Sequence, residues 1–222
     1  MEESLLKAMR SLETGVCHIY HKKFDDWTND RLLEYIAEPT DDRLYAIAQL
    51  IRGGVDLVLI YNRTKIDMFF LEKFKNIVEF ERVVEAAPMD IEVLREAKRM
   101  GFSDKFIGQL WGVSQHDMYL LREKNGIFPV YKMIDTCASE FSSYVPYFYS
   151  TYEDENESLV SDKEKIVVLG SGPIRIGQGV EFDYSTVHAI WSIREAGYEA
   201  IIINNNPETV STDYTTSDKL YF

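Results

Sequence analysis

The residues whose types and spacing could do chemistry are the glycines of the segment GSGPIRIGQGVEFDY. Gly170, Gly172 and Gly177 follow the apolar run 165–169, and glycine lets backbone N–H groups approach an anion closely. Established phosphate-binding patterns do not fit, because Arg175 stands where a dinucleotide-binding loop needs glycine and no Gly-Lys-Ser or Gly-Lys-Thr occurs. The segment therefore indicates an anion-handling loop but does not identify its ligand.

Two carboxylates could share this site. Glu181 lies just after the glycines, and Glu208 lies in the polar segment 204–213. Ligands bind at the carboxyl ends of parallel strands in α/β folds, so segments 170–183 and 204–213 should face each other. Glu181 and Glu208 would then approach one crevice, although a loop carboxylate is more often simply solvated. We expect His188, on the intervening helix, to be a bystander rather than a catalyst.

The elements that must position this loop form a β-α-β unit. The run 165–169 predicts a buried strand, a helix follows Asp183 and ends at Gly197, and 200–203 predicts a second, parallel strand. A third short strand leads to the last residue, Phe222. The predicted fold class of this part is an incomplete Rossmann-like parallel β-α-β unit.

Before residue 150 the apolar residues recur at helical spacing, which predicts an all-helical N-terminal domain. Its longest helix begins with a capping-box pattern at Thr64 and Asp67. The tyrosine-rich segment after Gly126 is expected to be extended chain that packs back across the helices or lines a subunit contact. The predicted helices are 28–37, 40–53, 64–85, 90–100, 103–111 and 114–124.

The helical hairpin 103–126 has the pattern of a helix-turn-helix, so a DNA-binding regulator is one alternative. A recognition helix needs cations for the DNA phosphates and donors for the bases. The cations Lys105, Arg122 and Lys124 are cancelled by three acids, which leaves the hairpin without net charge. An ordinary structural hairpin is therefore favoured.

Composition narrows the class of protein further. The net charge of −13 argues against a general binder of nucleic acids or anionic membranes, because such proteins carry an excess of basic residues. No apolar run reaches the roughly 18 residues of a membrane helix. Cys17 and Cys137 fit no disulfide or metal pattern and are expected to be free thiols in a reducing compartment. The N-terminus lacks a secretory signal pattern, so we expect a cytoplasmic protein.

Several motifs resemble the large subunit of carbamoyl-phosphate synthase. The segments GSGPIRIGQGVEFDY and EAGYEAIIINNNPETVSTDYTTSDKLYF are similar to the opening of its carbamoyl phosphate synthetic half, and VYKMIDTCASEF and YFYSTYEDENE to its oligomerisation domain. ESLLKAMRSLE is similar to the last helix of its carboxyphosphate synthetic half. The implied domains are the end of that half at 1–10, the oligomerisation domain at 11–152, an acidic linker at 153–164 and a truncated pre-ATP-grasp domain at 165–222.

The resemblance implies part of an ATP-dependent ligase. In that family a glutaminase small subunit supplies ammonia, and two ATP-grasp halves phosphorylate bicarbonate and then carbamate, using ATP, Mg²⁺ or Mn²⁺, and K⁺. Carbamate passes between the halves through an internal tunnel. By motif match, Arg175, Gly179, Glu181 and Glu208 are expected at the wall of this tunnel and active site. Glycine leaves room there, and charged groups can hydrogen-bond carbamate.

The implied partners are the rest of the large subunit, the glutaminase subunit and a second copy bound through the helical domain, with no nucleic acid and no membrane. The chain ends at Phe222, before any ATP-grasp module, so we expect no cofactor, no metal and no complete catalytic site in it. It should be inactive alone and expose a sheet edge. A stand-alone anion- or nucleotide-binding module is the other alternative. Oligomer size, allosteric effectors and the choice between pyrimidine and arginine biosynthesis stay open.

Overall fold

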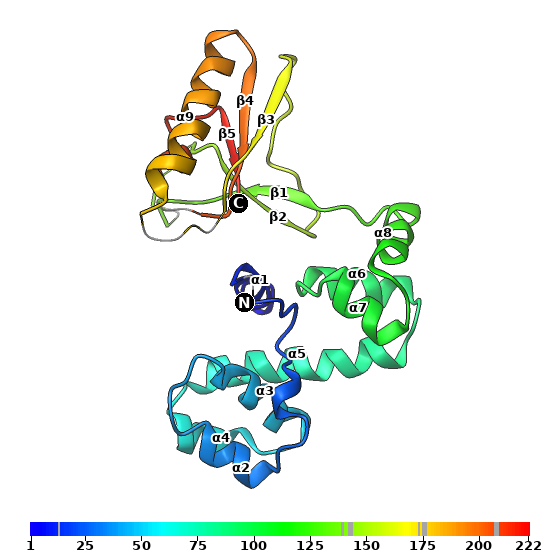
Figure 1. The fold of residues 1–222 in the computed structure, drawn as a ribbon. Coiled ribbons are helices and arrows are strands. Elements are labelled where there is room, and N and C mark those ends of the chain that lie inside the picture. The colour runs from blue at the N-terminus through cyan, green and yellow to red at the C-terminus, as the bar shows by residue number, and fades with distance from the viewer. Residues whose placement is uncertain (13, 139, 142–143, 173, 175–176, 207–208) are drawn as a thin grey trace. The chain divides into compact units, whose positions relative to one another are not determined.

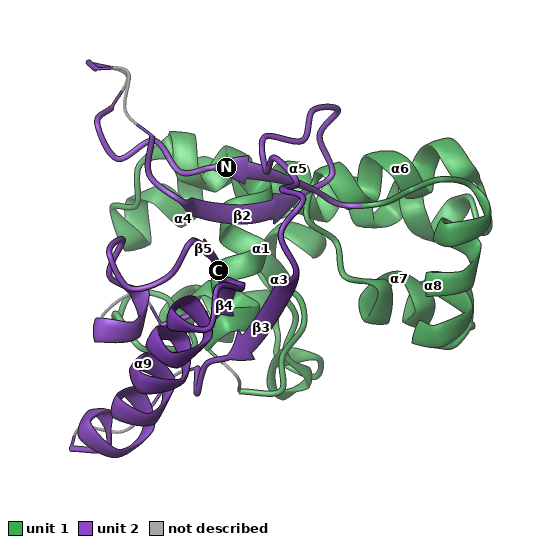
Figure 2. Cartoon of the chain, turned by 90° about the horizontal axis from the view of Figure 1, so that it is seen from above, with its two compact units in different colours: residues 1–128 green, residues 129–222 purple. Residues whose placement is uncertain are grey.

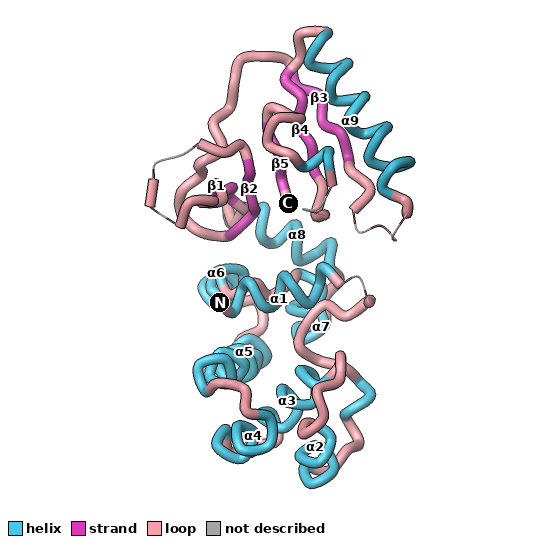
Figure 3. The backbone as a smooth tube through the Cα atoms, turned by 90° about the vertical axis from the view of Figure 1, so that its left-hand side faces the viewer, coloured by secondary structure: helices cyan, strands magenta, loops and turns pink. Residues whose placement is uncertain are grey.

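The computed structural model describes residues 1–222 apart from 13, 139, 142–143, 173, 175–176 and 207–208, drawn as a grey trace in Figure 1. It divides the chain into unit 1 (Met1–Phe128) and unit 2 (Pro129–Phe222), coloured separately in Figure 2. Helices build the described part of unit 1, and the described strands all lie in unit 2 (Figure 3). The predicted fold class, a helical domain followed by a Rossmann-like α/β unit, is confirmed.

Polar caps determine where most helices of unit 1 begin. Thr28, Asp90, Ser103 and Ser114 each accept a hydrogen bond from a backbone N–H of the first turn. The helices predicted at these caps are confirmed. The elements are α1 (Glu2–Ser11), η1 (Lys22–Phe24), α2 (Asn29–Tyr35), α3 (Arg43–Arg52), α4 (Leu57–Thr64), α5 (Met68–Ala86), α6 (Ile91–Arg99), α7 (Asp104–Trp111) and α8 (Gln115–Lys124).

The predicted helix 64–85 is wrong at its start, because the chain turns there between two helices. Thr64 ends α4, and its Oγ1 donates to a carbonyl one turn earlier at 2.9 Å, so it is not an N-cap. Lys65 adopts a left-handed φ of 57°, and Asp67 caps α5 by accepting from the Phe69 N–H at 2.8 Å. Apolar spacing continues across this turn, so periodicity could reveal neither the break nor α4.

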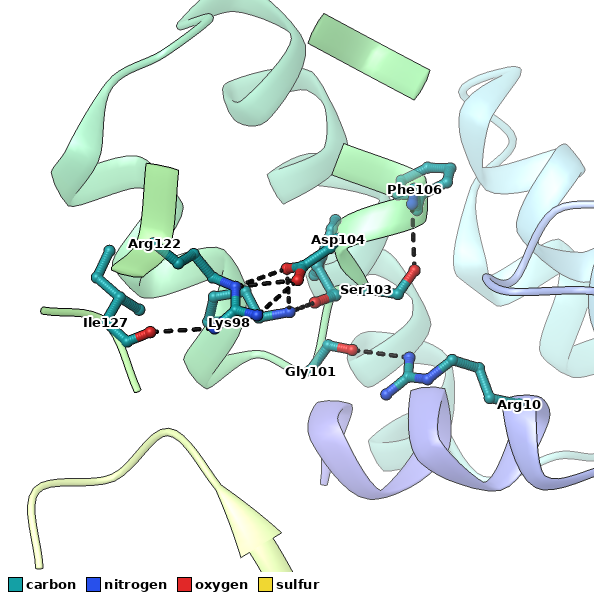
Figure 4. A network of polar contacts seen from close by, with 9 residues as sticks. Arg10, Lys98, Gly101, Ser103, Asp104, Phe106, Arg122 and Ile127 are labelled. Carbon is teal, nitrogen blue, oxygen red and sulfur yellow. Dashed lines mark hydrogen bonds and ion pairs between the residues drawn. The ribbon is translucent and has the colours of Figure 1, made fainter. Parts of the chain in front are cut away.

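α1 is anchored to the rest of unit 1 near both of its ends. Glu2 accepts from Asn76 Nδ2 of α5 at 2.9 Å, and Arg10 Nη1 donates to the carbonyl of Gly101 at 2.8 Å (Figure 4). α1 also packs against α5. Segment 1–10, expected to be the end of a preceding domain, therefore packs as part of unit 1.

A buried ion cluster joins the last helices of unit 1 (Figure 4). The Asp104 carboxylate accepts from Lys98 Nζ at 2.8 Å and from Arg122 Nη2 at 2.7 Å. Lys98 also donates to the carbonyl of Phe102, and Arg122 Nη1 to that of Ile127. Burial raises the pKa of Asp104, but the hydrogen bond from Arg122 and the charge of Lys98 outweigh it and hold this pKa below its usual value.

The described strands of unit 2 form one mixed sheet with the order β1-β2-β5-β4-β3. β3, β4 and β5 run parallel, and β1 pairs with β2 in the antiparallel direction. Leu169 lies opposite Ile203 where β3 and β4 end, so the loops after these strands leave the same edge. The elements are β1 (Val130–Met133), β2 (Tyr147–Thr151), β3 (Lys165–Leu169), α9 (Gly179–Glu195), β4 (Glu199–Ile203), η2 (Val210–Thr212) and β5 (Lys219–Tyr221).

α9 covers one face of this sheet (Figure 1). Ile190 of α9 packs with Ala200 and Ile202 of β4, and all three side chains are buried. Side chains alternate between the two faces of a strand, and Val167 and Leu169 of the edge strand β3 are exposed. The predicted β-α-β unit is confirmed, with an open edge and exposed apolar side chains on β3.

The described part of segment 129–152 belongs to unit 2, where it forms the strands β1 and β2 of the sheet. The sequence analysis expects extended chain here, but assigns it to the helical domain. β2 pairs with β5 in parallel, and the Leu220 N–H donates to the carbonyl of Pro146 at 2.8 Å. Backbone groups on the outer side of β5 would otherwise lack partners, and β2 satisfies them. The helical unit therefore ends at Phe128, whereas the predicted oligomerisation domain extends over 11–152.

The acidic stretch 153–164, predicted to be a linker, is bonded to the sheet. Glu157 accepts from the Met133 N–H at 2.7 Å and from Lys132 Nζ at 3.2 Å. Both partners of this carboxylate, a cation and a backbone donor, lie on β1. The composition of the stretch does not indicate these contacts. Both flanks of the stretch belong to unit 2, so the boundary between the units lies earlier in the chain.

Replacing Asp104 with asparagine should strongly destabilise unit 1. The substitution leaves the buried cations Lys98 and Arg122 without their carboxylate, and breaking a buried ion pair costs about 3–5 kcal/mol. Urea unfolding followed by circular dichroism measures the loss. The matched control is Asp26→Asn, at an exposed aspartate, which should change the free energy of unfolding little.

The same cluster makes stability depend on pH. The folded pKa of Asp104 is depressed below 3.8, so its contribution is present above that value and is lost as the pH falls through the folded pKa. Asp104→Asn should therefore lose less stability than the parent chain on acidification through this window. Equal acid sensitivity of the two proteins would contradict this assignment.

Candidate functional site

One buried amide, that of Asn204, joins the loops that follow β3 and β4. Its Oδ1 accepts from the backbone N–H groups of Gly172 and Asn206, both at 3.2 Å, and its Nδ2 lies 3.4 Å from Ser211 Oγ. The side chain is 3% exposed. The two loops therefore face each other, as predicted.

A buried carboxylate makes a second link between the two loops. Asp183 lies near the start of α9, and its Oδ2 accepts from the Ser211 N–H at 3.0 Å. The sequence predicts a helix after Asp183, but α9 begins at Gly179. Its N-cap, Gln178, makes no side-chain capping bond, so the sequence carries no usual start signal there.

Close packing of the loops explains the glycine at position 170. A Cβ on Gly170 would lie 2.5 Å from Cγ of the buried Asn204 side chain, a distance that requires one of the two to move. Gly172 adopts a left-handed φ of 67° next to the same amide. These glycines therefore serve the contact between the loops.

A groove of about 780 Å³ runs between the loops along α9. Its wall is mostly apolar, and the His188 ring lies on it between the rings of Tyr184 and Trp191, with centroids 4.2 Å and 5.2 Å away. Asp183 and Asn206 contribute polar atoms. The lining residues are Ile174, Gly177, Gly179, Val180, Asp183, Tyr184, Val187, His188, Trp191, Asn206, Thr209 and Val210.

The structure places only some of the predicted site residues. Gly179 is the first residue of α9 and lines the groove. Glu181 is exposed on the same helical turn and is not among the residues that line it. Arg175 and Glu208 lie outside the described residues, so the predicted approach of Glu181 and Glu208 stays a prediction.

Two backbone N–H groups of the described glycine loop already have partners within the protein. The Gly170 N–H donates to the carbonyl of Ile203 at 2.8 Å, and the Gly172 N–H donates to Asn204. A phosphate cradle needs such donors to point at its ligand. Among the described residues, no group of three or more His, Cys, Asp or Glu side chains could hold a metal ion such as magnesium.

The hairpin of α7 and α8 does not offer its arginine to DNA. Arg122 is 8% exposed and is held by Asp104 and by the carbonyl of Ile127. Phosphate contacts need cations that are accessible at the surface. These contacts support the structural interpretation of the hairpin.

Asn204 and Asp183 are the site residues that the sequence analysis passes over. Their positions in the sequence could have indicated them. Asn204 directly follows a parallel strand and Asp183 lies near the start of a helix, and both places lie at the edge of the sheet where ligands bind in α/β folds. Their role as internal links depends on burial, which spacing does not show.

The fold is a helical domain followed in the chain by a Rossmann-like α/β unit. The candidate site of that unit lies at the carboxyl ends of its parallel strands. A family model described as "Carbamoyl-phosphate synthetase large chain, oligomerisation domain" matches residues 1–126. A second, described as "Carbamoyl phosphate synthase preATP-grasp domain", matches residues 162–222. The chain belongs to the carbamoyl-phosphate synthase large-chain family of ligases, and the resemblance read from its motifs is confirmed. No described helix is long and apolar enough to span a membrane.

Gly170→Ala should destabilise unit 2, because the new methyl group collides with the buried Asn204 side chain. Overpacking of this kind costs about 1–3 kcal/mol. The matched control is Gly179→Ala, whose Cβ would meet Ile174 Cδ1 at an ordinary 3.8 Å. Urea titration of the amide NMR signals of 165–222 compares the two, and equal stability of both variants would refute the packing argument.

Proposed function

We propose that the chain supplies two parts of a glutamine-dependent carbamoyl-phosphate synthase. Unit 1 is an oligomerisation scaffold, and unit 2 contributes to the wall of the carbamate tunnel and active site. The enzyme makes carbamoyl phosphate from bicarbonate and glutamine-derived ammonia, using ATP, in the cytoplasm, for pyrimidine or arginine biosynthesis. The observation that carries this proposal is that two domains of one large chain match in order along the sequence.

The groove of unit 2 has room for a small intermediate. Its wall is mostly apolar, and Gly179 at the start of α9 leaves space that a side chain would fill. Arg175, Glu181 and Glu208 are proposed to hydrogen-bond carbamate along this route. Asn204 holds the two loops that form the groove at a fixed distance from each other. The groove is therefore formed before a ligand binds.

Exposed apolar side chains support the scaffold role of unit 1. Val58 and Leu59 on α4 and Phe69 and Phe70 at the start of α5 are each 43–54% exposed. Neighbouring exposed apolar residues of this kind are typical of protein contact surfaces, and a second copy is their proposed partner. The open edge of β3 is proposed to meet the rest of the large subunit.

ATP, its Mg²⁺ or Mn²⁺, and K⁺ are proposed to be held by other parts of the large subunit. This is supported by the N–H groups of Gly170 and Gly172, which are already bonded within the protein. The purified 222-residue polypeptide should therefore neither hydrolyse ATP nor form it from carbamoyl phosphate and ADP. A coupled assay with magnesium and potassium tests this, and turnover that purifies with the polypeptide would contradict the proposal.

Filling the groove at Gly179 tests the proposed route in a complete synthase carrying this sequence. Gly179→Leu should lower carbamoyl phosphate formation by about tenfold or more, while bicarbonate-dependent ATP hydrolysis continues. The physical reason is that the first phosphorylation does not need the blocked passage. The measurement is the ratio of carbamoyl phosphate formed to ATP hydrolysed.

Gly179→Ala is the control, because its methyl group makes only ordinary contacts. It should keep the ratio of the parent enzyme. A Gly179→Leu enzyme with an unchanged ratio would exclude the groove from the route, whereas loss of both activities with lowered stability would refute the claim that this position is spacious.

A further inference from the structure

A buried histidine, His18, anchors the segment 14–21 to the helices of unit 1, in a region to which the proposed function assigns no role. This segment lies between α1 and η1. His18 is 1% exposed, and the neighbouring Ile19 is fully buried. The His18 ring stacks on Phe106 of α7 with centroids 3.7 Å apart, and its Nε2 lies 2.8 Å from Oε1 of Glu81 in α5.

The carboxylate beside His18 is already neutralised by another cation. Glu81 accepts from Nη2 of Arg52 in α3 at 2.6 Å and from its Nε at 2.8 Å. Nη2 of Arg52 also donates to the carbonyl of Ile19 at 3.0 Å. A proton added to His18 would place a second cation beside this one carboxylate, and the charge of Arg10 in α1 disfavours it further.

The second ring nitrogen of His18 has no acceptor for an added proton. A neutral imidazole carries one N–H, and the Glu81 carboxylate places it on Nε2. Nδ1 is buried and has no hydrogen-bond partner among the described residues. Protonation of the packed ring would therefore create a buried, charged N–H without a partner, which is unfavourable.

These contacts link the protonation of His18 to the packing of its segment. Burial lowers the pKa of His18 below its ordinary 6.5, and the hydrogen bond and charge of Glu81 only partly offset this. A ring that leaves the site enters water and regains its ordinary pKa. The packed segment is therefore fully stabilised above about pH 6.5, and this stabilisation is lost as the pH falls from there to the lowered pKa of the packed ring.

We propose that His18 is a pH-sensitive switch, in which protonation of its ring releases the segment 14–21 from α3, α5 and α7. The release breaks the hydrogen bond between Arg52 and the Ile19 carbonyl and exposes the Ile19 side chain. Glu81 and Arg52 stay paired with each other, so α3 and α5 remain joined. The switch thus frees one connection of the scaffold without unfolding its helices.

Methyl NMR of Ile19 in the whole 222-residue chain measures the release, because this side chain is buried only while the segment is packed. Saturation-transfer experiments give the ratio of released to packed segment even when the released state is rare. This ratio should increase about five- to tenfold from about pH 7.5 to about pH 5.5. An unchanged ratio, or a charged His18 ring in the packed state at the lower pH, would overturn the proposal.

Two variants assign the effect to one histidine. His18→Gln removes the titrating ring but keeps an amide N–H that can donate to Glu81, so its ratio should not change over the same pH range. His21→Asn is the matched control in the same segment, because Nδ1 of His21 accepts from the Lys23 N–H at 3.1 Å and an asparagine carbonyl can replace it. This control should keep the increase of the parent chain. A pH-dependent ratio in His18→Gln, or loss of the increase in His21→Asn, would assign the switch to another group and refute the proposal.

Discussion

The hydrogen bonds of the Asn204 side chain are the constraint on which the site of unit 2 depends. A primary amide is suited to this position because it accepts two backbone N–H groups at Oδ1 while its Nδ2 faces Ser211, and it carries no charge that burial would penalise. The parallel pairing of β3 and β4 places both loops at one edge, but pairing alone does not fix the distance between them. Asn204 does so, and Gly170 has no side chain because that amide occupies the space.

In unit 1, a cluster of charged side chains holds separate segments together, as the Asn204 amide does in unit 2. Asp104 lies between Lys98 and Arg122 and ties α6, α7 and α8 together. The two cations also donate to the carbonyls of Phe102 and Ile127, in the segments that follow α6 and α8. Such a cluster is specific in its geometry, because removal of one member leaves the others buried and unpaired. It also explains why a hairpin with the pattern of a DNA-binding motif is a structural element: its arginine is already engaged inside the unit.

The sequence predicts the elements that have local signals. Caps at Thr28, Asp90, Ser103 and Ser114 mark helices because a side-chain oxygen there can accept a bond from the first turn. The glycine-rich motif and the parallel strands beside it place the site at the correct edge. A local signal is missing where long-range contacts decide the structure.

Three features show this limit. The hairpin β1-β2 belongs to unit 2 because the edge of β5 needs partners, and nothing in its own composition specifies that. The acidic stretch is held by Glu157 through donors on β1 that lie more than twenty residues away in sequence. The internal links made by Asn204 and Asp183 require burial as well as position, so spacing drew attention to the neighbouring exposed Glu181 instead.

Amide hydrogen exchange in Asn204→Ala, compared with the parent chain, tests the central claim most directly. The amides of Gly172 and Asn206, which donate to the Asn204 side chain, should exchange markedly faster in the variant. The amide of Gly170, which donates to the backbone of Ile203, should keep its protection and report an intact sheet. Unchanged exchange at Gly172 and Asn206 would mean that the two loops are held by something other than this amide, and the account of the site would be wrong.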